Sequence, residues 1–209
     1  FPMKFTFPLM ALALLLLLSG CETPWMTNTK RNAIEQYLIS SVVERGISSA
    51  SFKAYRNKKV VMDYAYFDPQ TDKLYTQGVL ELRLAELGMI IVKKAEDADY
   101  IIQPLCGVLA TDHSKIFLGT PSLPVPVPNA NLDIVIPEIP LFQKFTRYGY
   151  GKFSFVVYEA KGRKPHEVLP TTRSSARYID WVILLIPFKT HDMEMGDSVP
   201  AEIQYDFNL

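Results

Sequence analysis

The side chains that could carry chemistry are few, and their spacing matches no common catalytic or metal-binding motif. The three histidines, His113, His166 and His191, are far apart in the chain, and none has a second histidine at H-x-x-x-H spacing. In the pairs Asp112–His113 and His191–Asp192 an acid adjoins a base, but adjacent side chains diverge and do not form a triad by themselves. The sequence also lacks G-x-S-x-G, P-loop and G-x-G-x-x-G motifs. We therefore predict no catalytic residue, no cofactor and no metal site.

Three ionisable residues stand inside segments that otherwise have the pattern of strands: Asp63, Arg177 and Asp180. A charged side chain in a strand either points outward to solvent or, when buried, pairs with an opposite charge. We expect one of these structural roles for each of the three residues, rather than a catalytic one.

The overall charge argues against a nucleic-acid-binding protein. The chain of 209 residues carries 22 Lys plus Arg and 22 Asp plus Glu, hence no net charge, and it has no polybasic block. A protein that binds nucleic acid needs a positive surface to neutralise phosphates, so we exclude nucleic acid as a partner. With 48% hydrophobic and 21% charged residues, the composition is typical of one globular domain.

The N-terminal segment 1–20 has the composition of a signal peptide. One charge, Lys4, precedes an apolar stretch from Phe5 to Leu18. As a helix this stretch would rise about 21 Å, against about 30 Å for the hydrocarbon core of a bilayer. That length is short for a permanent membrane span and typical of the hydrophobic region of a signal peptide.

The quartet Leu18-Ser19-Gly20-Cys21 follows directly, and it resembles the lipobox of bacterial lipoproteins. The resemblance implies that the Cys21 thiol receives a diacylglycerol, that cleavage precedes Cys21 and that the new amine is acylated. Several acyl chains anchor a protein stably, whereas one chain alone binds marginally. We therefore expect a mature chain held to a membrane by Cys21, with residues 21–29 as a tether.

The residue after the lipidation site indicates which membrane this is. By the retention rule of the same lipoproteins, Glu22 in place of an aspartate implies the outer membrane, and we expect the domain to face the periplasm. With Cys21 lipidated, Cys106 has no partner for a disulfide within the chain. Its apolar neighbours predict an inert core thiol.

The first part of the domain alternates predicted helices and strands. Apolar residues at 3.6-residue spacing predict a helix over 30–45 that begins at Thr29 and ends at Gly46. A β-branched and aromatic run predicts a strand over 59–67. A second helix is predicted over 73–87, closed by the following glycine.

Four further segments have the pattern of strands: 89–92, 100–110, 149–158 and 174–188. Pro104 indicates an edge or bulge position for the second of them. The last contains the longest apolar run after the signal peptide. We expect it to form a buried strand paired with 149–158, with Val182 and Leu184 on one buried face.

These elements predict a single α+β domain over residues 30–195, with two or three helices packed on a mostly antiparallel sheet of about five strands. Residues 196–209 are polar, and we expect a flexible tail there.

A proline-rich arm, residues 116–145, interrupts this domain. Six of the 15 prolines fall between Pro121 and Pro140, and residues 116–132 carry no charge. Proline fixes φ and removes a donor, so we predict polyproline II rather than helix or central strand. Two interpretations stay open: the arm packs on its own domain, or it offers a surface to a partner protein or the membrane interface. The apolar residues spaced among the prolines are the candidate contacts: Leu123, Val125, Val127, Ile134, Ile136 and Ile139.

The domain resembles those of uncharacterised bacterial lipoprotein families. The residues that carry the resemblance are 59–63 (K-V-V-M-D) and 98–102 (A-D-Y-I-I), together with the lipobox and the order of helices and strands. Such domains are similar to those of curli-secretion-type (CsgG-like) and penicillin-binding-protein-activator lipoproteins. The curli channel inserts charge-free hairpins into the outer membrane, whereas this chain has the proline arm. No ligand or catalytic residue can therefore be transferred from that resemblance.

The sequence thus predicts a non-enzymatic, lipid-anchored envelope protein that works through protein contacts in outer-membrane or envelope assembly. Its expected partners are the membrane, through the lipid on Cys21, and an unidentified envelope protein; self-association into a homo-oligomer is left open. The competing prediction is a periplasmic ligand-binding or hydrolytic lipoprotein, which would need a polar cleft that the sequence does not reveal.

Overall fold

A computed structural model describes residues 31–126 and 133–194, and all of these belong to one unit of the chain, Thr29–Gly196. The signal peptide, Cys21, Glu22 and the tether lie outside the described residues, as do Val127 and the C-terminal tail. For residues 124–126 and 133–136 only the backbone is described. No helix in the described ranges is long and apolar enough to cross a membrane.

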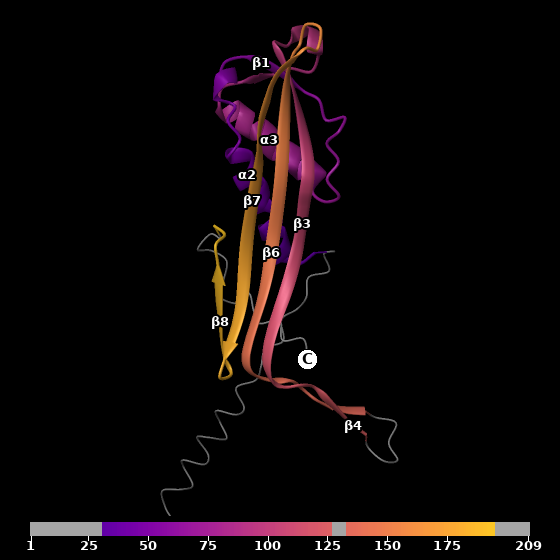
Figure 1. Ribbon diagram of the computed structural model, residues 1–209, viewed down its shortest axis with the longest axis vertical. Helices are drawn as coiled ribbons and strands as arrows, with labels where there is room; N and C mark the ends of the chain where they lie inside the picture. The colour runs from indigo at the N-terminus through magenta and orange to yellow at the C-terminus, as the bar shows by residue number, and fades with distance from the viewer. Residues whose placement is uncertain (1–30, 127–132, 195–209) are drawn as a thin grey trace, which may run out of the picture. The chain divides into compact units, whose positions relative to one another are not determined.

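The domain is built on a curled, six-stranded mixed sheet with the order β2-β1-β3-β6-β7-β8 (Figure 1). Strand β1 runs parallel to both of its neighbours, and the other pairs are antiparallel. The strands are β1 (Lys59–Met62), β2 (Ile90–Ile91), β3 (Tyr100–Thr120), β6 (Ile139–Glu159), β7 (Pro165–Ile183) and β8 (Ile186–His191).

The prediction of an α+β domain with a mostly antiparallel sheet of about five strands is therefore wrong. The protein is mostly β, with two α-helices in the described residues, α2 (Ala33–Ser48) and α3 (Lys73–Glu86), and two 3₁₀ turns, η1 (Lys53–Tyr55) and η2 (Ala95–Asp97). The parallel pairing arises because α3 supplies the crossover that returns the chain beside β1 as β2.

Three strands are far longer than predicted, which explains the excess of β structure. Strands β3 and β6 have 21 residues each and β7 has 19. Segment 111–115 (T-D-H-S-K) resembles a loop in sequence, yet it stays paired with β6 throughout. Its side chains are exposed on both faces, so no alternation of apolar and polar residues marks it as strand.

Helix α2 packs on β6 and β7 and supplies much of the core. It begins at Asn32, whose side chain accepts a hydrogen bond from the Glu35 N–H, and not at Thr29. Gly46 does not end it but lies inside it, because the helix passes directly over Phe153. A Cβ on Gly46 would lie 2.6 Å from that ring, so glycine permits the close approach.

Two further predictions, for the second helix and for Pro104, are confirmed. Helix α3 covers 73–86 and is followed by Gly88 with φ +80°, close to the expected 73–87. Pro104 lies beyond the last β1–β3 pair, Met62↔Ile102. Backbone N–H and C=O groups of alternate residues face the same side of a strand, so the Pro104 nitrogen faces the same side as Ile102. Strand β1 ends before this position, and the missing N–H of Pro104 therefore costs no hydrogen bond there.

The C-terminal apolar run is two strands and a turn, rather than one buried strand. Ile183 pairs with Ile186, and Leu184 and Leu185 form the two-residue turn between them. Val182 is buried as predicted, but Leu184 is 71% exposed, so its predicted burial is wrong. Five consecutive apolar residues, 182–186, leave no alternation that could have located the turn. The run pairs with residues 142–151 of β6, which overlap the expected partner 149–158 only at its start.

The centre of the proline arm is a small hairpin, so the polyproline II prediction is wrong. Strand β4 (Leu123–Pro126) pairs antiparallel with β5 (Asp133–Ile136), and residues 116–120 and 139–145 continue β3 and β6. Pro124 and Pro126 are two residues apart, so their nitrogens face the same side of β4. A two-stranded hairpin has no strand on that outer side, and the missing donors cost no hydrogen bond there.

Candidate interaction surface

The three histidines lie in separate places, each with a structural contact. His113 on β3 lies beside Phe145, with 5.8 Å between ring centroids, and His166 at the start of β7 lies 5.0 Å from the Tyr100 ring. His191 ends β8, where Nδ1 contacts a backbone carbonyl at 3.1 Å. Across residues 31–126 and 133–194, no three His, Cys, Asp or Glu side chains are grouped to hold a metal ion.

Two of the charged strand residues hold neighbouring elements together. Asp63, just after β1, accepts hydrogen bonds from the Arg163 guanidinium and the Ala65 N–H. Burial alone would raise the pKa of Asp63, but these hydrogen bonds keep it below its usual value. Asp180 on β7 accepts from Arg147 on β6 at 2.9 Å. Both carboxylates therefore have structural partners.

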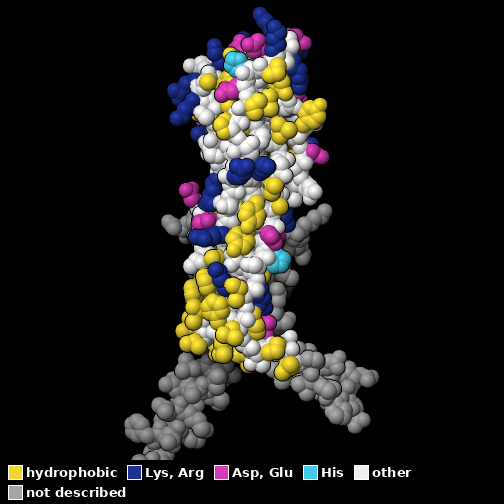
Figure 2. Space-filling model, in the orientation of Figure 1, with side chains coloured by type: hydrophobic (Ala, Val, Ile, Leu, Met, Phe, Trp, Pro, Cys, Tyr) yellow, Lys and Arg dark blue, Asp and Glu magenta, His cyan; other side chains and the backbone are white. Residues whose placement is uncertain are grey.

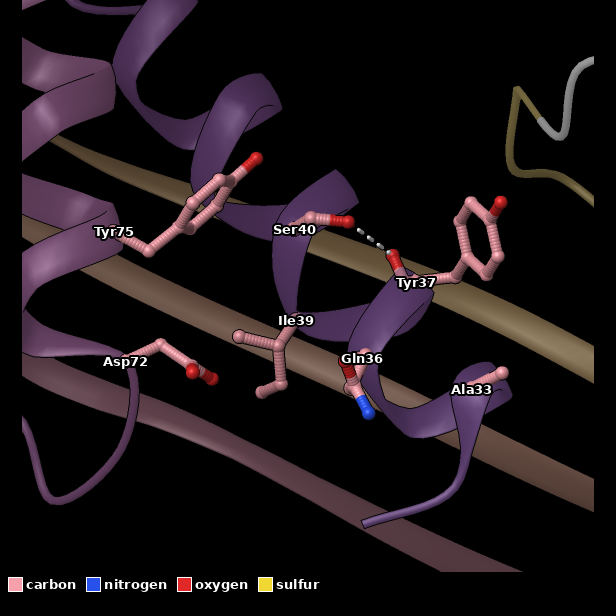
Figure 3. A pocket seen from close by; sticks show the side chains of 7 residues that line it. All are labelled: Ala33, Gln36, Tyr37, Ile39, Ser40, Asp72 and Tyr75. Atoms are coloured by element: carbon pink, nitrogen blue, oxygen red, sulfur yellow. Dashed lines mark hydrogen bonds between the residues drawn. The ribbon is translucent and has the colours of Figure 1, made fainter. Parts of the chain in front are cut away.

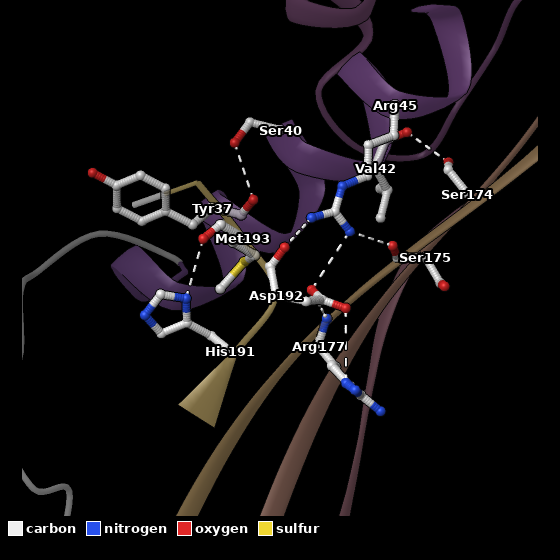
Figure 4. A network of polar contacts seen from close by, with 10 residues as sticks. All are labelled: Tyr37, Ser40, Val42, Arg45, Ser174, Ser175, Arg177, His191, Asp192 and Met193. Carbon is white, nitrogen blue, oxygen red and sulfur yellow. Dashed lines mark hydrogen bonds and ion pairs between the residues drawn. The ribbon is translucent and has the colours of Figure 1, made fainter. Parts of the chain in front are cut away.

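Arg177, the third, belongs to a network around Asp192 (Figure 4). The Asp192 carboxylate accepts from the Arg177 backbone N–H at 2.9 Å and lies 3.5 Å from a guanidinium nitrogen of Arg45. The same guanidinium donates to the Asp192 carbonyl and, at 2.7 Å, to the Ser175 carbonyl. Arg45 lies on α2, and Ser175 and Arg177 lie on β7. The network therefore fastens Asp192, in the chain after β8, to both the helix and the sheet.

A groove beside α2 is the nearest feature to a cleft, and Figure 3 shows its lining. Its strongest polar groups, the Asp72 carboxylate and the Tyr75 hydroxyl, already have partners within the protein. Asp72 accepts from Arg31 at 2.6 and 2.7 Å, and the Tyr75 hydroxyl donates to Glu44 at 2.6 Å. Burial and that hydrogen bond raise the pKa of Tyr75 to about 12. The carboxylate and the Tyr75 hydroxyl of this groove are therefore engaged in contacts within the fold. The lining residues are Ala33, Gln36, Tyr37, Ile39, Ser40, Asp72 and Tyr75.

Cys106 is half-buried on β3, with Sγ 3.6 Å from the Val108 carbonyl oxygen. Burial raises the pKa of this thiol, so it stays protonated at neutral pH. A protonated thiol is a poor nucleophile, in line with the structural role expected from its neighbours.

At the end of the sheet where the arm leaves it, four neighbouring strands carry exposed or half-buried apolar side chains (Figure 2). The register aligns Leu118, Phe142, Ile183 and Ile186 across β3, β6, β7 and β8. Directly paired residues point to the same face of a sheet, so these four form one continuous row. Leu118 is 66% and Ile186 67% exposed.

A second row on the same face lies two residues further from this end, where the register aligns Ile116, Lys144, Trp181 and Phe188. The Trp181 and Phe188 rings stack at 5.9 Å, and the Lys144 ammonium lies 4.9 Å from the centre of the Trp181 ring. We call the apolar members of both rows, together with the turn 184–185, the apolar tip.

The base of the proline arm adjoins the apolar tip. Leu123 is 47% and Ile139 46% exposed, and Thr120 pairs with Ile139 at the end of β3. Of the other candidate arm residues, Val125, Ile134 and Ile136 are described by backbone only, and Val127 lies outside the described residues. Leu123 and Ile139 are thus the candidate contacts whose side chains the structure places.

The sequence pattern did not reveal the apolar tip. The continuously apolar run predicts a buried strand over Leu184, Leu185 and Ile186. A leucine pair carries no turn signal, since two-residue hairpin turns favour Asn-Gly or Asp-Gly. The lack of charge and the nearby prolines place Ile116 and Leu118 in the predicted arm and not at the end of a sheet. Only the pairing between strands brings these residues together.

A protein-family model described as "Family of unknown function (DUF6655)" matches residues 15–201. No curated protein matches the chain.

Proposed function

This chain belongs to the family of unknown function DUF6655, and we propose that it is a lipid-anchored protein of the bacterial outer membrane that acts without catalysis. It faces the periplasm and works through contact with another envelope protein, in outer-membrane or envelope assembly. The anchor is the lipid on Cys21, for which the support is the lipobox sequence L-S-G-C at 18–21.

The observation that carries the contact role is the exposure of two apolar side chains, Leu123 and Ile139, at the base of the arm. Apolar side chains exposed at one place on a surface are typical of interaction sites. Leu123 and Ile139 lie at the base of the arm, where a partner can reach them. Pro124 and Pro126 fix φ in strand β4, so this strand loses little entropy when it docks.

The competing function, a hydrolase or ligand-binding lipoprotein, finds less support in the described residues. The carboxylates of Asp63, Asp72, Asp180 and Asp192 are engaged in ion pairs or hydrogen bonds that join elements of the fold. A catalytic or ligand-binding cleft would instead leave polar groups directed at a common point.

The anchor is tested by intact-mass measurement of protein from the native host. We expect the mass of a chain that starts at Cys21 and carries acyl groups. Cys21→Ala should leave an uncleaved precursor without added mass, because it removes the only acceptor thiol. A wild-type chain that starts elsewhere, or that carries no lipid, would contradict the proposal.

The contact role is tested by placing a photo-crosslinking amino acid at Leu123 or Ile139 in living cells. Val168, 69% exposed on β7 outside the apolar tip, is the matched control. We expect one defined envelope protein to be linked from the two arm positions and not from Val168. Equal yields from all three positions, or none, would contradict a specific contact at the arm.

A further inference from the structure

The turn between β7 and β8 has residues that its own geometry disfavours. Leu184 has φ +48° and Leu185 has φ +69°, so both lie in the left-handed region of a two-residue type I′ turn. Such turns select Gly, which has no Cβ, and Asn, whose short polar side chain can hydrogen-bond locally, whereas a leucine is strained at positive φ. The other non-glycine residues with positive φ in the described chain are polar or charged: Asn57, Asp72 and Arg163.

The two leucines gain nothing from burial that would offset this strain. Leu184 is 71% and Leu185 61% exposed to solvent. Residues held in strained conformations persist where function requires them, so the strain points to a role outside folding. An exposed apolar pair at the extremity of a hairpin fits insertion into an apolar phase.

The charges around the apolar tip indicate what that phase is. Segments 116–126, 139–143 and 181–188 contain no charged residue. The Lys144 ammonium lies over Trp181, three residues before the turn and about 10 Å from it along the strand. Trp and Lys at this distance behind apolar side chains match a bilayer surface, where indole rings occupy the headgroup level and lysines extend toward anionic phosphates.

We infer that the apolar tip inserts into the lipid–water interface of a phospholipid bilayer, with Leu184 and Leu185 in the acyl region and Trp181 and Lys144 among the headgroups. The depth is that of interfacial segments, about 5–10 Å, and not a span. This second contact orients the domain on the membrane. It does not rest on lipidation of Cys21 or on the protein partner of the proposed function.

The experiment uses the full chain from the native host with Trp25→Phe, which leaves Trp181 as the one tryptophan. The protein is added to vesicles of phosphatidylglycerol and phosphatidylcholine in equal parts, with or without bromine on the acyl chains of the phosphatidylcholine. We expect bromolipid to quench Trp181 fluorescence. The paired change Leu184→Asn with Leu185→Gly should abolish that quenching.

The stability of the same variants separates lipid contact from a folding role. Asn-Gly suits the type I′ turn, so the paired variant should melt about 2–4 °C higher than the wild type without vesicles. Leu185→Asp should also lose quenching, whereas the matched control Val168→Asp should keep it.

Three results would overturn the inference: no quenching in the wild type, equal quenching in the turn variants, or a lower melting temperature of the Asn-Gly variant. Self-association of the wild type that the turn variant loses, with Trp181 unquenched, would identify the apolar tip as an interface between copies. Intact mass, measured on the same samples, reports separately whether the Cys21 anchor is present.

Discussion

Strand β7 has a turn at each end, and the two turns are built from different residues. At its start, segment 160–164 (A-K-G-R-K) contains Gly162 with φ +77° and Arg163 with φ +51°. Arg163 bonds to Asp63, which ties that turn to the end of β1. At its finish, Leu184 and Leu185 adopt similar positive φ values with exposed apolar side chains.

This difference indicates that one end of the sheet stabilises the fold and that the other end contacts something outside the protein. At the end that carries the turn 160–164, the ion pair between Arg163 and Asp63 and the buried side chains of the core favour the folded state. At the apolar tip, turn chemistry and exposure both oppose it, so these residues are explained by a contact with something else. The predictions below test this division, beginning with the largest effect.

Phe153→Ala should destabilise the domain by about 3–5 kcal/mol, because it removes a fully buried ring beneath α2. Leu185→Ala at the apolar tip is the matched control and should change the free energy of unfolding by less than about 0.5 kcal/mol. Urea unfolding measures both. Comparable losses of unfolding free energy in the two variants would contradict the view that the core stabilises the fold and the apolar tip does not.

Asp192→Ala should cost about 1 kcal/mol, because it removes the carboxylate that accepts from the Arg177 N–H and lies beside Arg45. The backbone carbonyl of residue 192 still accepts from Arg45, which limits the loss. Thermal unfolding tests this value, and an unchanged melting temperature would show that the network does not fasten the chain after β8.

The smallest effect concerns pH at the Asp63–Arg163 pair. The pKa of Asp63 is below its usual value in the folded protein, so the pair stabilises the fold above the unfolded pKa. That contribution is lost as pH falls through the folded pKa. The difference in melting temperature between wild type and Asp63→Asn should therefore shrink below about pH 4. A difference that stays constant from about pH 3 to 7 would exclude this contribution.

The helix-covered end could be predicted in part, and the apolar tip could not. Helix α3 was found because a periodic run is closed by Gly88, and Pro104 was placed at an edge because it has no donor. Both signals are local, since they follow from the conformation or hydrogen bonding of one residue.

The apolar tip and the long strands depend on pairing between distant segments. Leu118 and Ile186 stand 68 positions apart in sequence numbering and lie in one row because β6 and β7 lie between them. Hydrophobicity alone assigned the C-terminal run to the core, since burial in protein and insertion into lipid select the same residues. The sequence did not predict the proline hairpin. Prolines at every second residue are compatible with polyproline II and also with a strand whose outer side is unpaired.

Hydrogen–deuterium exchange of the native chain, with and without phosphatidylglycerol–phosphatidylcholine vesicles, compares the two turns of β7 in one measurement. We expect vesicles to slow amide exchange in a peptide covering 181–188 and to leave a peptide covering 159–165 unchanged. Exchange in 181–188 that is the same with and without vesicles, or protection confined to 159–165, would contradict the assignment of the apolar tip to the membrane surface.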